Sequence, residues 1–195
     1  MLRTTDAATT CDIKRNAKGK TFLMGAEKMK METMQDVGDI MRLAASKRAV
    51  GSTSMNSVSS RSHSVFTIFI NGTCEQHGKR IIGALNLCDL AGSERLARSK
   101  ATGAQLKETQ AINKSLSALA DVFMALKAKQ KHVPYRNSKL TYLLEPCFSK
   151  DGKTMMLVNV SPTQLSAQET TCSLRFAQQV GVCSLCLFSC ACASE

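Results

Sequence analysis

The sequence predicts an α/β fold, in which helices pack against a sheet. Short apolar runs rich in β-branched residues alternate along the chain with longer segments of helical periodicity, a pattern typical of layered folds. Hydrophobic residues make up 44% of the chain and charged residues 21%, as in ordinary globular proteins. A chain of 195 residues can bury one core, and no repeat or low-complexity linker divides it, so we expect one domain.

The first predicted element is a hairpin turn. The stretch N-A-K-G-K-T-F contains Gly19-Lys20-Thr21, a tripeptide that also ends the phosphate-binding pattern G-x-x-x-x-G-K-[ST]. Lys14 stands where the first glycine of that pattern should be, and no apolar strand precedes it. A single glycine does not supply the cradle of free N–H groups that a phosphate needs. We therefore expect a turn through residues 18–20 and not a phosphate loop.

A helix and two strands follow. Apolar residues at three- and four-residue spacing, with Thr33 and Asp36 as a cap, predict a helix over about residues 34–48. S-V-F-T-I-F-I at residues 64–70 and R-I-I-G-A-L-N-L-C-D at residues 80–89 predict two strands, joined as a hairpin by turn residues. Because the second strand is apolar at nearly every position, we expect both of its faces to be covered.

A long helix is predicted from residue 105 onward, and it must end before Pro134. Its spacing would also fit a coiled coil, but it extends over too few heptads to favour one. The predicted apolar face consists of Leu106, Ile112, Leu116, Leu119, Phe123 and Leu126.

Three further elements complete the predicted fold. A shorter helix is expected over residues 137–148, and K-T-M-M-L-V-N-V at residues 153–160 predicts another apolar strand. Ser166 and Glu169 form a capping box for a last helix over about residues 167–180.

The net charge of +11 indicates an acidic partner: nucleic acid, an anionic membrane or an acidic protein surface. Residues 1–16 lack the apolar core of a secretory signal, so we expect an intracellular chain with reduced cysteines. The apolar run at residues 180–193 is too short to span a bilayer. Four of the nine cysteines crowd this tail, which would be unstructured or would bind a soft metal: Cys183, Cys186, Cys190 and Cys192.

Two stretches carry side chains suited to phosphate chemistry. Asp89 directly follows a predicted strand, where ligands gather in α/β sheets and where a carboxylate can hold a magnesium-bound water. Gly92 can bring a bare N–H close to a phosphate oxygen. N-S-V-S-S-R-S-H at residues 56–63 supplies hydroxyl, amide, guanidinium and imidazole groups within eight residues. Each stretch alone would also fit an ordinary turn or a solvated loop.

Together with a third stretch, these motifs resemble the kinesin motor domain. N-x-x-S-S-R-S-H at residues 56–63 is similar to its switch I, and D-L-A-G-S-E at residues 89–94 is similar to its switch II. H-V-P-Y-R-N-S-K-L-T at residues 132–141 resembles the loop and helix that kinesins place on the microtubule. The wording L-N-L-C-D-L-A-G-S-E-R-L-A-R-S is most similar to the C-terminal-motor, minus-end-directed branch.

The resemblance implies a partial P-loop NTPase motor fold, with a central sheet flanked by helices, that lacks the N-terminal half. It covers residues 11–180, between an unmatched segment at 1–10 and a Cys-rich unmatched tail at 181–195. The phosphate loop and first core strands of the family have no counterpart. The family activity implied is ATP-dependent movement on microtubules. Whether this chain hydrolyses ATP stays open, and the alternative is a non-catalytic microtubule-binding module.

The cofactors implied by the resemblance are ATP and Mg²⁺. Arg61 and Glu94 would form the salt bridge that closes the switches around the attacking water, Gly92 would donate to the γ-phosphate, and Ser60 and Asp89 would hold magnesium, Asp89 through water. The catalytic residues implied are Ser59, Ser60, Arg61 and Glu94. The nucleotide-binding residues implied are Asn56, Ser60, Asp89 and Gly92.

The partner implied is the microtubule, whose acidic surface would attract the basic charge. We expect a cytoplasmic, microtubule-associated chain without membrane contact, and dimers in a longer parent with a neck coiled coil. Nucleic acid is not expected, because the chain has no Trp and 5% aromatics for a stacking platform. The microtubule-binding residues implied are Lys127, Lys129, Lys131, His132, Tyr135, Arg136 and Lys139.

Overall fold

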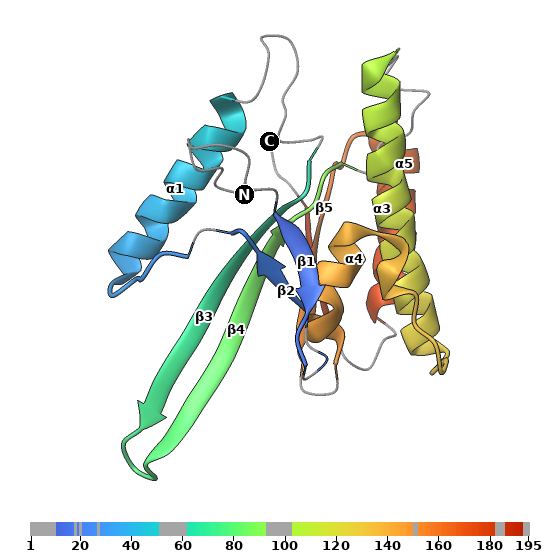
Figure 1. Cartoon of the computed structure of the whole chain (residues 1–195). Helices are drawn as coiled ribbons and strands as arrows, with labels where there is room; N and C mark the ends of the chain where they lie inside the picture. The colour runs from blue at the N-terminus through green and yellow to red at the C-terminus, as the bar shows by residue number, and fades with distance from the viewer. Residues whose placement is uncertain are drawn as a thin grey trace. The chain divides into compact units, whose positions relative to one another are not determined.

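The structure is a computed structural model that describes residues 11–17, 19, 21–26, 28–50, 62–92, 103–149, 152–181 and 186–192. The chain forms two compact units, where the sequence led us to expect one domain. The first unit comprises Met1–Thr9 and Ala26–Gly92, and the second comprises Thr10–Gly25 and Ser93–Glu195. Figure 1 shows the helices and strands of each unit.

Helix α1 (Met34–Val50) of the first unit confirms the helix predicted there. Its first turn is closed by reciprocal hydrogen bonds. The Asp36 N–H donates to Thr33 Oγ1 at 3.2 Å, and the Thr33 N–H donates to Asp36 Oδ2 at 2.8 Å, which is the predicted cap. The backbone N–H groups of Glu32 and Thr33 stabilise the Asp36 carboxylate and hold its pKa below the ordinary value.

Strands β3 (Ser64–Cys74) and β4 (Lys79–Asp89) form the predicted hairpin. They pair antiparallel along their whole length, and Ser64 lies opposite Asp89 at the open end. Gly78 in the connecting turn has a φ of 60°, a left-handed conformation that favours glycine. The hairpin is therefore a long two-stranded ribbon, seen in green in Figure 1.

The faces of this ribbon are open, so the prediction that β4 is covered on both faces is wrong. Ile82 is 73% exposed and Phe69 is 66% exposed, with Lys28 Nζ 5.4 Å from the centroid of the Phe69 ring. Among the residues that the structure describes, no third strand pairs with the ribbon. An apolar sequence gives a buried strand only where other layers pack on it, and the described part of this unit does not supply them.

The second unit holds the other described elements. The helix predicted over residues 137–148 is divided into three short pieces, and Pro146 lacks the N–H that would continue an α-helix. None of the described helices is both long and apolar enough to cross a membrane. The elements are β1 (Asp12–Arg15), β2 (Thr21–Met24), α3 (Ala104–Lys127), η2 (Tyr135–Asn137), α4 (Lys139–Leu144), η3 (Glu145–Phe148), β5 (Thr154–Val160), η4 (Gln164–Ser166), α5 (Ala167–Gly181) and β6 (Cys186–Cys192).

Gly19 and Thr21 of the Gly-Lys-Thr tripeptide belong to the β1–β2 hairpin. The two strands pair antiparallel with Arg15 opposite Thr21. Gly19 has a φ of 75°, and its N–H donates to the Asn16 carbonyl at 2.9 Å. An ion pair between Arg15 and Glu145 joins the hairpin to η3. The predicted hairpin is confirmed by the paired strands and by Gly19, whereas Lys18 and Lys20 of the predicted turn lie outside the described residues. Thr21 begins a strand and not the helix that follows a phosphate loop.

Strand β5 has one covered face and one open face. Val158 and Val160 pack with Ala177 of α5, whereas Met155 and Leu157 on the other face are 61% and 62% exposed. Strand β6 pairs with β5 in parallel along its full length. The expectation of an unstructured tail is therefore wrong for residues 186–192. An edge strand offers a row of unpaired N–H and C=O groups, and this part of the tail satisfies them along one edge of β5.

The core of the second unit gathers on α3. The Phe123 ring lies edge-on to the rings of Phe148 and Phe176, with centroids 5.2 Å and 6.4 Å away. Leu106, at the start of the predicted apolar face, is exposed. The buried residues of α3 include Ile112, Ala118, Leu119, Val122, Phe123 and Ala125.

Replacing Phe123 by Ala should lower the free energy of unfolding by about 3–5 kcal/mol, because it leaves a cavity beside the rings of Phe148 and Phe176. Urea unfolding followed by circular dichroism measures this loss. Phe69→Ala is the matched control: its ring is already exposed, so its effect should stay within about 0.5 kcal/mol. Equal losses in the two variants would show that the three rings do not form the stabilising core.

Candidate functional site

The β3–β4 ribbon brings the two predicted switch motifs to one end. Strand β3 begins directly after the first motif, and β4 ends at Asp89, the first residue of the second motif. Because the strands are antiparallel, the start of β3 lies beside the end of β4, with Ser64 opposite Asp89. The buried Ala91 N–H then donates to His63 Nδ1 at 3.1 Å. The described ends of the two motifs are thus hydrogen-bonded to each other.

Two predicted nucleotide-binding residues lie at this end. Asp89 is exposed at the carboxyl end of β4, and Gly92 is half-buried just beyond Ala91. A carboxylate in this position suits a magnesium-bound water, since Mg²⁺ prefers oxygen ligands and keeps several waters. Within the described ranges no three His, Cys, Asp or Glu side chains are close enough to hold a metal by themselves. The other predicted residues of this site lie outside the described residues: Asn56, Ser59, Ser60, Arg61 and Glu94.

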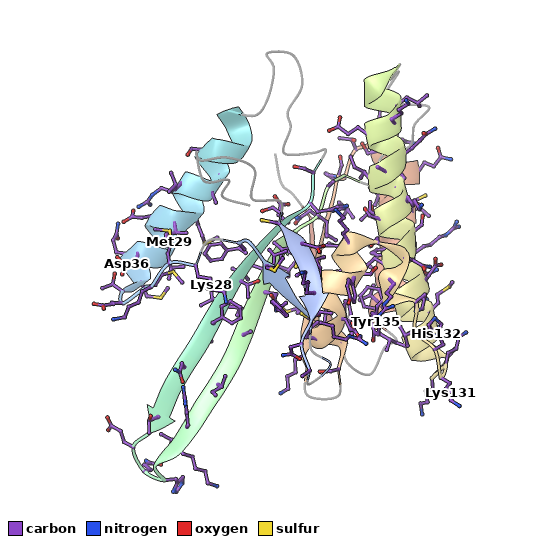
Figure 2. The ribbon with its side chains drawn as sticks, viewed as in Figure 1. Lys28, Met29, Asp36, Lys131, His132 and Tyr135 are labelled. Carbon is purple, nitrogen blue, oxygen red and sulfur yellow. The ribbon has the colours of Figure 1, made fainter. Side chains whose placement is uncertain are left out.

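The predicted microtubule-binding residues lie from the last residue of α3 to the first residue of α4, in what we term the basic segment (residues 127–139). It contains five Lys or Arg residues and no Asp or Glu. Figure 2 shows Lys131 and His132 on the loop after α3, with Tyr135 closer to α4. Tyr135 is half-buried, whereas the other predicted residues are exposed: Lys127, Lys129, Lys131, His132, Arg136 and Lys139. The expectation that the lysines project from a surface loop is confirmed for Lys129 and Lys131 and is wrong for Lys127 and Lys139, which are exposed at the end of α3 and the start of α4.

A buried threonine holds the second half of this segment. The fully buried Thr141 hydroxyl donates to the Tyr135 carbonyl at 2.7 Å. Ser138 caps α4, because its Oγ accepts from the Thr141 N–H at 3.1 Å and its own N–H donates to Thr141 Oγ1 at 3.2 Å. These neutral groups fix the backbone and leave the lysine and arginine side chains exposed.

Two aromatic contacts also order the segment. The Tyr135 ring is stacked on Phe148, with centroids 6.3 Å apart and planes 5° apart. The Arg136 guanidinium lies 5.6 Å from the centroid of the Tyr142 ring, within the range of a cation–π contact. The ring of Tyr135 is therefore engaged inside the unit, which the sequence did not indicate.

Sequence reasoning missed a hollow beside the basic segment that is lined mainly by polar residue types. It has a volume of about 300 Å³ and is formed by α3 and η2. The α3 residues that line the hollow recur at three- and four-residue spacing, on the helix face opposite Ile112 and Leu119. This spacing in the sequence could have identified them as a second face of the helix. The lining residues are Lys114, Ser117, Ala118, Asp121 and Asn137.

Comparison with known proteins identifies the class. The family model described as the kinesin motor domain matches residues 1–183, and the chain belongs to this family. It is 52% identical over 173 residues to the kinesin-like protein KIN-14D of Arabidopsis thaliana, covering 89% of this chain and 22% of that protein. It is 53% identical over 149 residues to kinesin-related protein 2 of Dictyostelium discoideum, covering 76% of this chain and 19% of that protein.

Comparison with solved structures supports membership of the same family. The motor domain of Kar3 from Saccharomyces cerevisiae matches with a TM-score of 0.74 and 43% identity, covering 88% of this chain and 53% of that chain. KIF14 with ADP, in complex with a microtubule, matches with a TM-score of 0.77 and 31% identity, covering 100% of this chain and 56% of that chain. The chain thus spans about a fifth of these curated relatives and about half of these solved chains. The motor fold and the resemblance to the C-terminal-motor branch are confirmed.

Replacing His63 by Ala should remove the hydrogen bond that connects the two motifs. The buried Ala91 N–H would lose an acceptor, and a buried unpaired donor costs about 1–3 kcal/mol. Amide hydrogen exchange at Ala91 should therefore accelerate about tenfold. His63→Asn keeps an acceptor near that N–H and should retain most of the protection. Unchanged exchange in His63→Ala would show that this hydrogen bond does not join the motifs.

Proposed function

We propose that this chain is the switch and microtubule-binding part of a kinesin motor domain, and that microtubule binding is the function its own residues support best. The observation that carries this proposal is the basic segment, with exposed cations from the end of α3 to the start of α4 and no acid among them. Tubulin presents an acidic surface, so the attraction is long-range and weakens with salt. The similarity to KIF14, solved in complex with a microtubule, supports the same partner.

We also propose that the ribbon end takes part in sensing nucleotide. Asp89 would hold a magnesium-bound water and Gly92 would donate its N–H to the γ-phosphate. The hydrogen bond between His63 and Ala91 supports coupled movement of the two motifs. When bound, ATP would supply the phosphoryl group for transfer to water and magnesium would neutralise the developing charge, with positioning and charge stabilisation as the main catalytic contribution. The residues assigned to the first motif and to closure of the switches are Asn56, Ser59, Ser60, Arg61 and Glu94.

Nucleotide binding by this chain alone should be weak. Gly19 and Thr21 of the first Gly-Lys-Thr lie at a β-hairpin turn, where the Gly19 N–H donates to the Asn16 carbonyl and not toward an open cradle. A second Gly-Lys-Thr begins at Gly152, but Cys147 stands at the position of the first glycine and β5 follows. A Cβ at Gly152 would lie 2.2 Å from the Cys147 carbonyl oxygen, so this glycine serves close packing. The rival function, a non-catalytic microtubule-binding module, therefore stays in view, and a microtubule-stimulated ATPase assay separates the two.

Membership of the family also supports proposals about the cellular location and the oligomeric state. We propose that the chain acts on microtubules in the cytoplasm, and that a longer parent dimerises through a coiled coil. The Kar3Vik1 structure, a C-terminal motor and motor homology domain fused to a synthetic heterodimeric coiled coil, supports the second point. We further divide the chain into an N-terminal segment at residues 1–10, a partial motor domain at residues 11–180 and a tail at residues 181–195.

Neutralising Lys127, Lys129 and Lys131 together should weaken microtubule binding about tenfold or more at low salt, and much less at high salt. Each exposed charge contributes on the order of 1 kcal/mol or less, but three act on one acidic lattice. Co-sedimentation across a salt series measures this, and removing the acidic tails of tubulin should have a similar effect. The proposed function would be ruled out if the chain melts cooperatively, and is therefore folded, but does not bind microtubules at low salt.

Replacing Lys20 by Ala should leave ATP affinity within about twofold of the parent, because the described residues on both sides of Lys20 pair as a hairpin and Thr21 begins a strand, whereas a phosphate loop is followed by a helix. Titration with a fluorescent ATP analogue measures this. Lys153→Ala, in the second Gly-Lys-Thr, is the matched control and should behave in the same way. A loss of tenfold or more in one variant alone would assign a phosphate-binding lysine to that position.

A further inference from the structure

The two faces of the β3–β4 ribbon differ in composition. In an antiparallel pair, directly opposed residues share a face, and successive residues of a strand lie on opposite faces. One face, which we term the mixed face, carries polar contacts between the strands. On this face Thr67 Oγ1 donates to Asn86 Oδ1 at 2.7 Å, and Arg80 Nε donates to Asn71 Oδ1 at 3.0 Å. The other, which we term the apolar face, carries six large hydrophobic residues: Phe66, Ile68, Ile70, Ile81, Leu85 and Leu87.

The apolar face is not covered by the described part of the chain. No residue of β3 or β4 is buried, and on this face Ile70 is 50% exposed and Ile81 is 55% exposed. A two-stranded ribbon is marginally stable by itself and needs a further layer on its hydrophobic side. An exposed apolar surface with polar surroundings also marks an interaction site. The apolar face therefore requires a partner surface that is itself apolar.

The two ends of the apolar face carry opposite charges. Lys79 and Asp89 are the first and last residues of β4, both are exposed, and the usual rise of an antiparallel strand places them about 34 Å apart. The register places both on the apolar face, Lys79 opposite Cys74 and Asp89 opposite Ser64. A second ribbon stacked in the reverse direction would bring each ammonium group near a carboxylate. A ribbon stacked in the same direction would bring like charges together, which is unfavourable.

We propose that the apolar face of the ribbon is an interface between two copies of this chain, stacked face to face and antiparallel about a two-fold axis. A surface that pairs with itself about such an axis must be self-complementary. This face meets that condition, because its hydrophobic residues would fill the middle and Lys79 of each copy would lie near Asp89 of the other at both ends. The interface uses the ribbon alone, so it is separate from the coiled coil proposed for a longer parent and does not depend on microtubule binding.

Neighbouring isoleucines on opposite faces provide a matched test. Sedimentation velocity of the full chain at about 1–100 μM, in about 0.15 M salt, should show the mass rising from that of one chain to that of two. Ile81→Glu places a carboxylate on the apolar face and should weaken dimerisation about tenfold or more. Ile82→Glu makes the same change on the mixed face and should leave it within about twofold. Because both side chains are exposed, both variants should keep the melting curve of the parent.

Charge reversal tests the orientation of the two copies. Lys79→Glu should weaken dimerisation about threefold or more, and so should Asp89→Lys, because each change places like charges together at both ends. Combining the two changes restores opposite charges and should recover most of the parent affinity. Arg80→Glu is the control, because it changes the net charge as much as Lys79→Glu does but lies on the mixed face.

Three results would contradict the inference. A parent that stays monomeric up to about 100 μM would overturn it and would mean that the apolar face has another occupant. Equal losses in Ile81→Glu and Ile82→Glu would reject the apolar face as the interface. A double charge variant that dimerises no better than the single variants would reject the antiparallel stacking. Microtubule co-sedimentation is measured separately, so none of these results bears on the proposed function.

Discussion

The arrangement of the candidate switch site depends on the antiparallel pairing of β3 with β4. The two motifs are separated in sequence by the whole ribbon, yet the pairing places the beginning of one strand beside the end of the other. The hydrogen bond from Ala91 to His63 then joins the chain just outside the ladder. A change of register by one residue would turn every side chain to the opposite face and would separate this donor from its acceptor. Strand register is therefore the constraint on which any contact between the motifs depends.

The basic segment depends on a different kind of order. Its two ends are fixed by neutral groups: a reversing turn at the end of α3, and the hydroxyls of Ser138 and Thr141 at the start of α4. Since neither device uses a cationic side chain, the positive charges stay on the surface. Such a loop combines a defined backbone with solvated charges, which favours rapid electrostatic encounter with an acidic partner.

Local patterns in the sequence were sufficient for most elements, including the turn at Gly19 between β1 and β2. Thr33 and Asp36 marked the start of α1, and alternating β-branched residues marked β3, because these signals are local. The open faces of β4 could not be foreseen, since burial depends on a second layer and not on the strand's own residues. Strand β6 was missed for a related reason: its pairing is decided by the edge that β5 offers. The left-handed conformation of Lys129, at the turn that ends α3, was missed because the residue itself does not favour it.

The open sheet faces have a consequence for the behaviour of the chain in solution. Ile82 and Phe69 on the ribbon, and Met155 and Leu157 on β5, expose large apolar groups, and such surfaces attract one another. At low ionic strength the net charge of +11 keeps the molecules apart by mutual repulsion. Added salt shortens the range of this repulsion and leaves the apolar attraction in place. Colloidal stability should therefore decline as ionic strength rises. The chain is best kept soluble in a buffer of low ionic strength, or with an additive that covers its exposed apolar surface.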